Sequence, residues 1–197
     1  RILRRYIDRC GYTSSFTIYD ASDSERLMKE ILRDQGLDDK TYPPRYVLSV
    51  IGRQKDRLIS PEEMEEDSRS ASDYRIVQIA RVYGIYQKRL KDNNALDFDD
   101  ILYVTVKLLQ QDREVREYYQ RKFHYVLVDE YQDTNHVQYL LTELLAGSRR
   151  NICVVGDDDQ SIYRFRGATI ENILSFEEQY PGARVIRLEQ NYRSTQS

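Results

Sequence analysis

The chain has 197 residues, of which 40% are hydrophobic and 32% charged, an ordinary balance for a globular protein of one domain or two small ones. No apolar run approaches the ~20 residues that a membrane-spanning helix requires, so we expect no membrane association and a cytoplasmic location. The two cysteines, Cys10 and Cys153, are far apart and lack the spacing of metal ligands. Cys153 lies in an apolar run, and we expect it to be a small core residue.

The charge is unevenly distributed along the chain. The formal net charge of −3 combines 23 basic and 22 acidic residues up to Lys122 with 7 basic and 11 acidic residues after it. A protein that binds nucleic acid over its whole surface is usually basic throughout. The composition excludes that kind of binder, so any contact with DNA has to be local, through arginines and aromatic residues gathered on one edge.

Helical patterns dominate the first ~120 residues. Residues 22–25, Ser-Asp-Ser-Glu, are typical of a capping box, and the helix that follows should end at Gly36. Pro43 and Pro44 break the chain, and Ser60 before Pro61 predicts a further helix start, for a long helix that ends near residues 93–94. Asp97 should cap another helix. The apolar residues expected on the inner faces are Leu27, Met28, Ile31, Leu32, Val47, Leu48, Ile51, Leu58, Ile79, Tyr83, Tyr86, Leu90, Phe98, Ile101, Leu102, Leu108, Leu109, Val115, Tyr118 and Tyr119.

From Phe123 onward the pattern changes to strand, helix, strand, short helix, strand. Apolar strands are predicted at residues 125–128, 152–155 and 185–188, and an amphipathic helix from Val137 should close at Gly147. Such alternation predicts a parallel sheet with both faces covered. Each strand ends in a polar loop, and ligands bind at the carboxyl ends of parallel strands.

The first of these loops begins with an acidic pair, Asp129 and Glu130. In phosphoryl-transfer enzymes an aspartate in this place holds Mg²⁺, and a neighbouring acid can orient the attacking water. On these residues alone, a strand end with two solvated acids fits equally well.

Three sequence blocks follow the three strands: DEYQDT at residues 129–134, VGDDDQSIYRFRGA at 155–168 and LEQNYRST at 188–195. In order and spacing they resemble three consecutive motifs of the UvrD/PcrA/Rep-type superfamily 1 DNA helicases. The resemblance implies an α/β fold, with a mainly helical inserted subdomain at residues 1–122 and part of a RecA-like parallel-sheet P-loop NTPase domain at residues 123–197. It also implies an ATP-dependent helicase and translocase that moves 3′ to 5′ on single-stranded DNA and unwinds duplexes in DNA repair or replication.

The resemblance assigns roles in ATP hydrolysis to five of these residues. Asp129 would hold Mg²⁺, and Glu130 would activate the attacking water. Gln160 would sense the terminal phosphate of ATP, although a loop-capping amide is the simpler alternative for this residue. Tyr192 would stack on the adenine base, and Arg193 would bind the terminal phosphate.

Tyr163, Phe165 and Arg166 form the candidate DNA contact. Aromatic residues alternating with arginine on a loop are typical of a stacking platform for unpaired bases. The family usually has tryptophan where Phe165 stands, so stacking on the base should be weaker here. The expected partners are single-stranded and partially duplex DNA, with repair or replication proteins as further candidates.

A P-loop, Gly-x-x-x-x-Gly-Lys-Ser/Thr, is missing from the 197 residues, because no glycine is followed by lysine and no lysine occurs after Lys122. We therefore expect an internal piece of a longer helicase that is inactive as an ATPase by itself. Two alternatives remain. One is a metal-dependent nuclease that uses Asp129, Glu130, Asp157 and Asp159 around two ions. The other is a non-catalytic interaction module that binds partner proteins through residues before Lys122.

Overall fold

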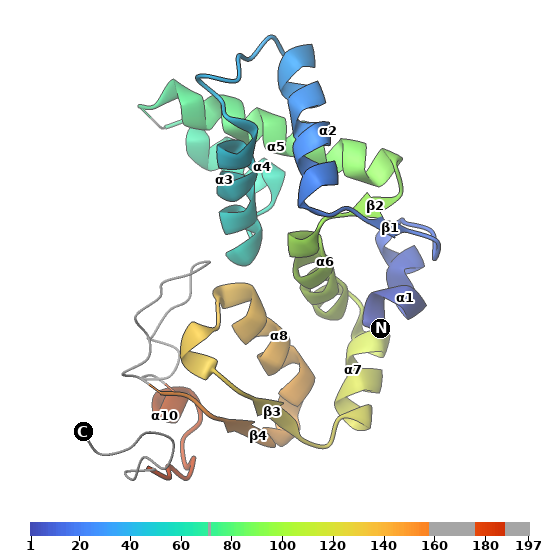
Figure 1. Ribbon diagram of the computed structural model, residues 1–197. Helices are drawn as coiled ribbons and strands as arrows, with labels where there is room; N and C mark the ends of the chain where they lie inside the picture. Colours follow the sequence, from blue (N-terminus) through green and yellow to red (C-terminus); the bar gives the residue numbers. More distant parts are fainter. Residues whose placement is uncertain (71, 158–175, 188–197) are drawn as a thin grey trace, which may run out of the picture.

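Helices make up most of the chain in the computed structural model, which describes residues 1–70, 72–157 and 176–187 (Figure 1). Helices α2 to α5 form the upper part in Figure 1, and α6, α7 and α8 with the strands β3 and β4 form the lower part. The first ten elements are α1 (Ile2–Tyr6), η1 (Ile7–Cys10), β1 (Thr17–Ile18), α2 (Ala21–Asp34), α3 (Pro44–Asp56), α4 (Pro61–Ser68), α5 (Tyr74–Asp92), β2 (Ala95–Leu96), α6 (Phe98–Gln111) and α7 (Arg113–Lys122). Further along the described residues lie β3 (Val126–Val128), η2 (Tyr131–Asp133), α8 (His136–Ala146), η3 (Gly147–Arg149), β4 (Ile152–Val154) and α10 (Phe176–Gln179).

Helix α2 begins two residues earlier than its sequence predicts. The N-cap is Asp20, not Ser22: its carboxylate accepts the Asp23 N–H at 2.8 Å, and the Asp23 carboxylate accepts the Asp20 N–H at 3.4 Å. Aspartate caps as well as serine does, so the earlier of two overlapping capping patterns prevails. The predicted end is confirmed, because Gly36 has a φ of 66° and the Leu37 N–H returns to the Leu32 carbonyl at 2.9 Å.

The long helix predicted from Pro61 to residues 93–94 is wrong, because two helices, α4 and α5, occupy that range. The Ser60 capping box itself is confirmed, with the Ser60 hydroxyl accepting the Glu63 N–H at 3.2 Å. Small polar side chains then compete with the helix for its own backbone: the Ser70 hydroxyl donates to the Asp67 carbonyl, and Asp73 caps a new helix.

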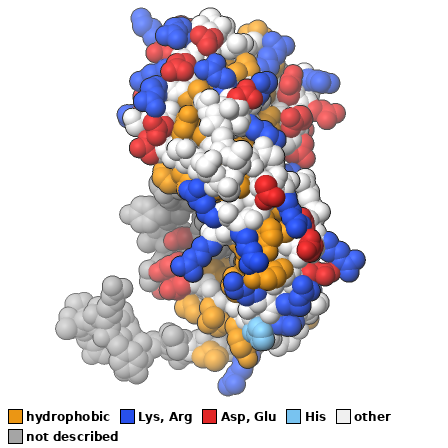
Figure 2. All heavy atoms as spheres, turned by 90° about the vertical axis from the view of Figure 1, so that its right-hand side faces the viewer, with side chains coloured by type: hydrophobic (Ala, Val, Ile, Leu, Met, Phe, Trp, Pro, Cys, Tyr) orange, Lys and Arg blue, Asp and Glu red, His pale blue; other side chains and the backbone are white. Residues whose placement is uncertain are grey.

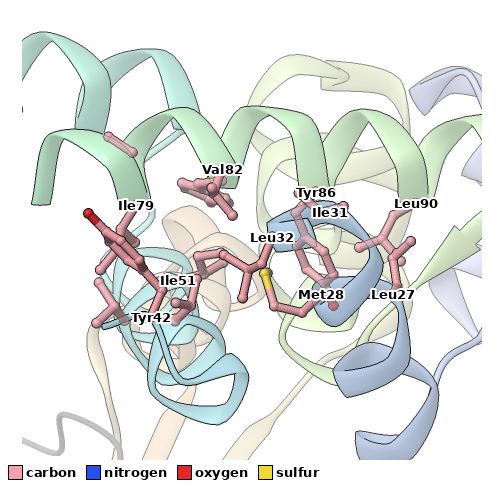
Figure 3. Close-up of a cluster of buried hydrophobic side chains, with 14 of the residues drawn as sticks. Leu27, Met28, Ile31, Leu32, Tyr42, Ile51, Ile79, Val82, Tyr86 and Leu90 are labelled. Atoms are coloured by element: carbon pink, nitrogen blue, oxygen red, sulfur yellow. The ribbon is translucent and has the colours of Figure 1, made fainter. Parts of the chain in front are cut away.

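The helices bury two hydrophobic clusters. The first cluster lies between α2, α3, α4 and α5, and Figure 3 shows Leu27 and Ile31 of α2 facing Tyr86 and Leu90 of α5. The second lies between α1, α6 and α7, with partly buried leucines of α8 packed against it. Strand β2 lies between the two clusters, because Ala95 belongs to the first cluster and Leu96 to the second. Phe98, expected on an inner face, is exposed.

A buried ionic group joins α3 to the start of α6. The ammonium of Lys55 is fully buried and lies 2.7 Å from Asp97 Oδ2 and 2.8 Å from Asp100 Oδ1. The Tyr86 hydroxyl donates to Asp97 at 3.1 Å, and the Gln87 amide donates to Asp100 at 3.0 Å. Both carboxylates also form the capping box of α6, so the predicted Asp97 cap is confirmed.

The contacts within this group shift the pKa values of its three charged side chains, Lys55, Asp97 and Asp100. Burial opposes the charge on Lys55, but Asp100 and Asp97 outweigh it and raise the lysine pKa. Burial also works against the Asp97 carboxylate, yet the ion pair with Lys55 lowers its pKa. For Asp100, burial and the neighbouring Asp97 charge outweigh the attraction of Lys55 and raise its pKa to about 6.

Among the described residues, two small parallel sheets complete the fold, which is therefore mainly helical α/β. Strand β1 pairs with β2, with Thr17 opposite Ala95. Strand β3 pairs with β4, with Leu127 opposite Cys153, and α8 connects the two strands. The predicted strand–helix–strand unit is thus confirmed. The third predicted strand is not, because the described residues 185–187 form no strand.

The expectation of strands buried on both faces is wrong for the described residues. Leu127 is 76% exposed and Tyr125 74% exposed, whereas Val126 and Val128 are half-buried. Cys153, predicted to be a core residue, is exposed as well. Burial alternates because Leu127 and Cys153, opposite each other in register, point to the same open face of the pair. Across the described ranges, no helix is long and apolar enough to cross a membrane.

Candidate functional site at the end of strand β3

The predicted acidic pair lies where β3 ends. Asp129 and Glu130 are both exposed, and Glu130 has a φ of 50° and a ψ of 43°, a left-handed backbone that residues other than glycine seldom adopt. The Glu130 N–H donates to Asp129 Oδ1 at 2.9 Å, and the Glu130 carbonyl accepts the Asp133 N–H at 2.9 Å. Backbone strain of this kind concentrates at functional sites, where surrounding contacts hold it in place.

Gln132 connects the ends of the two parallel strands. Its side chain is buried, and its amide nitrogen donates to Glu130 Oε2 at 2.7 Å. Its amide oxygen accepts the Asp157 N–H, three residues beyond the end of β4, at 3.1 Å. Gln132 is not among the residues that the sequence predicted for the site. Its place two residues after the acidic pair, inside the DEYQDT block, is the signal that marks it.

Tyr131 holds the turn in place through buried contacts. It is fully buried, its N–H donates to the Val155 carbonyl at 2.9 Å, and its ring meets Phe176 edge-to-face at 5.8 Å between centroids. Burial raises the pKa of its hydroxyl to about 12. Thr134 closes the turn by donating its hydroxyl to the Tyr131 carbonyl at 2.7 Å. The acidic pair is therefore exposed on a turn whose next residues are buried.

The turn leads directly into α8 and is tied there to the helical part. Asn135 caps α8 through a capping box with Gln138. Its amide nitrogen also donates to Asp56 Oδ1, at the end of α3, at 2.8 Å. The predicted amphipathic helix and its end at Gly147 are confirmed, with Val137 and Ala146 buried.

Asp129 and Glu130 bring oxygen ligands to the carboxyl end of a parallel strand. Asp129 uses one carboxylate oxygen for the Glu130 N–H and presents the carboxylate to solvent. Such a donor set fits Mg²⁺, which takes one or two carboxylates and keeps several waters. Among the residues described, no group of three or more histidine, cysteine or acidic side chains could hold a metal ion. A metal bound by Asp129 would therefore need water or phosphate oxygens as further ligands.

The structure places only these two of the predicted site residues. Outside the described ranges lie the other six: Gln160, Tyr163, Phe165, Arg166, Tyr192 and Arg193. Asp157, which the nuclease alternative invoked, lies beside Gln132, but its companion Asp159 also falls outside the described ranges.

Fold and site together define a mainly helical α/β protein that carries an acidic pair at the carboxyl end of a parallel strand. Residues 1–181 match the family described as UvrD/REP helicase N-terminal domain, so the chain belongs to this family. It is 53% identical, over 195 residues, to the ATP-dependent DNA helicase PcrA of Bacillus subtilis (strain 168). It is 49% identical, over 197 residues, to proteins of the same name from Staphylococcus epidermidis (strain ATCC 12228) and Staphylococcus aureus (strain NCTC 8325).

The matches cover 99% to 100% of this chain but only 26% to 27% of these relatives. The chain thus spans about a quarter of the length of the proteins that it resembles. The family resemblance expected from the three sequence blocks is confirmed.

Proposed function

We propose that this chain is part of an ATP-dependent DNA helicase that moves 3′ to 5′ on single-stranded DNA and unwinds duplexes during repair or replication. The observation that carries the proposal is the Asp129–Glu130 pair, exposed on a strained turn at the carboxyl end of β3. The names of the relatives, which are half identical to the chain, support the same activity.

In this proposal the acidic pair serves ATP hydrolysis. Asp129 binds Mg²⁺, which would neutralise charge on the phosphates, and Glu130 orients the attacking water. Gln132 holds the Glu130 carboxylate at 2.7 Å and thereby fixes its direction. Gln160 and Arg193 contact the terminal phosphate, and Tyr192 stacks on the adenine.

DNA is bound in this proposal by residues that follow β4 in the sequence. Tyr163 and Phe165 stack on unpaired bases, and Arg166 pairs with the phosphate backbone. Residues 1–122 form a helical inserted subdomain, and residues 123–197 contribute to a RecA-like motor domain. The β3–α8–β4 unit, with its parallel strands, supports the second assignment.

Glu130→Gln in a protein of the relatives' full length tests the proposal. ATP turnover stimulated by single-stranded DNA should be abolished, whereas ATP binding should remain, because the amide keeps the shape of the side chain but cannot accept a proton from water. Glu178→Gln is the control, since it removes the same charge from an exposed position in α10.

Three outcomes would contradict the proposal. Equal loss of ATP binding and turnover would make Glu130 a structural residue. Magnesium-dependent strand cleavage that depends on Asp129 would indicate a nuclease. DNA-stimulated turnover by the 197-residue chain itself would contradict the expectation that this chain, without a P-loop, is inactive.

A further inference from the structure

Two segments far apart in the sequence form a basic surface on a chain whose net charge is negative. Residues 1–10 and 112–122 contain eight basic and four acidic side chains, whereas the whole chain carries −3. The segments lie side by side, because Arg5 Nη1 donates to the Tyr118 hydroxyl at 2.9 Å and Arg9 pairs with Asp112 at 2.6 Å. We call this the α1–α7 surface. Figure 2 looks onto this side of the molecule and shows basic side chains next to hydrophobic ones, a class that includes tyrosine, with some acidic side chains among them.

Aromatic rings form the floor of the α1–α7 surface. Tyr6, Tyr118 and Tyr119 meet edge-to-face with centroids 5.1 to 6.4 Å apart, and Phe123 stacks on Tyr119 at 5.6 Å. The guanidinium of Arg5 lies 4.9 Å from the Tyr118 ring centre and 5.2 Å from that of Tyr6. The rings therefore hold Arg5 in place by cation–π contacts as well as by the hydrogen bond.

The cations of this surface differ in how far they are neutralised. Arg9 is paired with Asp112 and Glu114, and Arg113 and Arg121 share Glu117. Within the described part of the chain, no carboxylate lies within 4.0 Å of the cationic nitrogens of Arg5 or Lys122. The Lys122 ammonium lies 5.8 Å from the Tyr118 ring centre. Arg5 and Lys122 thus both lie near the Tyr118 ring, and neither has a carboxylate partner among the described residues.

This arrangement suits phosphate groups. A guanidinium has five N–H donors, and Arg5 uses one of them for the Tyr118 hydroxyl. Its remaining donors are exposed, and its side chain is already ordered by two rings, so binding a phosphate costs less conformational entropy than it would for a free arginine. Phe123 is 38% exposed and Tyr6 and Tyr118 are half-buried, so part of the aromatic floor is open beside the two cations. Bases can stack on such rings and an acidic peptide cannot, so the surface favours nucleic acid.

We propose that the α1–α7 surface is a second DNA-binding surface, on which Arg5 and Lys122 bind backbone phosphates. This inference rests on the proposed function in that it takes DNA as the ligand. It differs from the contacts proposed for Tyr163, Phe165 and Arg166, because it uses helices α1 and α7 rather than the residues that follow β4 in the sequence.

Binding of fluorescein-labelled single-stranded and duplex oligonucleotides to the 197-residue chain, measured over a range of salt concentrations, tests the inference. The variant is Arg5→Glu with Lys122→Glu. The matched control is Lys40→Glu with Arg81→Glu, which changes the net charge equally at two exposed positions of the helical part that carry no ion pair in the described structure. A third variant, Arg5→Lys with Lys122→Arg, keeps the charges. Circular dichroism verifies that each variant is folded.

Each phosphate contact contributes about 0.9 to the slope of log affinity against log salt for duplex DNA, so losing two contacts should lower the slope by about 1.8. When the salt concentration rises from about 50 to 200 mM, the ratio of the DNA affinity of the unmodified chain to that of the Arg5/Lys122 variant should therefore fall roughly tenfold. The control should keep the original slope, and the charge-keeping variant should retain most of it.

Identical slopes for the Arg5/Lys122 variant and the control would overturn the inference. The inference would also fail if poly-glutamate bound the unmodified chain but not the Arg5/Lys122 variant, while both bound DNA equally well. That result would indicate an acidic polypeptide as the partner. The proposed function is tested separately by Phe165→Ala. If Phe165→Ala weakens single-strand binding while the Arg5/Lys122 variant does not, only the α1–α7 surface fails.

Discussion

Replacing Lys55 with methionine should be among the most destabilising single changes in this chain. Methionine matches the length of the lysine stem but removes the charge that compensates Asp97 and Asp100, both buried. Removing one partner of a buried ion pair costs about 3–5 kcal/mol, because the remaining charge stays buried without compensation. Here two carboxylates remain, and both also cap α6, so we expect the upper part of that range.

Urea unfolding followed by circular dichroism measures the loss. The control is Lys88→Met. It breaks the ion pair between Lys88 and Asp92, whose charged atoms lie 2.6 Å apart and whose side chains are 75% and 54% exposed. Exposed pairs contribute little to stability, so the control should unfold almost as the unmodified chain does. The loss in free energy of unfolding caused by Lys55→Met should become smaller as the pH falls from about 7 to 5, because protonation of Asp97 and Asp100 removes their uncompensated charges. Equal losses in the two variants would refute this reasoning.

The pKa of Asp100 in the folded chain, about 6, lies above that of an unfolded aspartate, so its stabilising contribution is complete below pH ~4 and disappears as the pH rises through 6. Asp100→Asn should therefore cost about 1 kcal/mol more at pH 5 than at pH 7 in urea unfolding, and a cost independent of pH would contradict this. Gln132→Ala should destabilise the chain by about 1–2 kcal/mol and speed amide exchange at Asp157, since two hydrogen bonds of a buried amide are lost; unchanged exchange would argue against the strand-end bridge. Leu127→Lys should reduce self-association in light scattering, because the exposed face of β3 is apolar and an open strand pair is a template for another chain; a chain that is already monomeric would exclude this.

Local features of the fold could be predicted from the sequence, because neighbouring residues alone determine them. The Ser60 and Asp97 caps and the Gly36 stop depend on side chains within three or four positions of the helix end. The break between α4 and α5 is also local, but it depends on serine hydroxyls that compete with the helix, a weaker signal than a proline or a glycine.

Features that depend on tertiary packing could not be predicted in this way. The apolar run around Cys153 predicted burial, yet burial depends on what covers each face, and the face of Leu127 and Cys153 is open among the described residues. The pairing of Lys55 with Asp97 joins positions 42 residues apart. At the site, the sequence predicted Asp129 and Glu130 from their place after an apolar strand. Gln132 was missed because its role depends on Asp157, at the end of another strand.

The pairing of β1 with β2 determines how the four-helix part joins the rest of the chain. Because Thr17 lies opposite Ala95, the polypeptide leaves for α2 and returns from α5 at adjacent positions, about 4.8 Å apart. The first hydrophobic cluster lies wholly between these two positions. A segment with its own core and adjoining ends can be lengthened, shortened or exchanged without stretching the chain on either side. In this protein, insertions or deletions in the loops that join α2 to α5 can therefore be absorbed while the turn that carries Asp129 and Glu130 keeps its geometry, as long as Lys55 and Asp56 of α3 keep their contacts with α6 and Asn135.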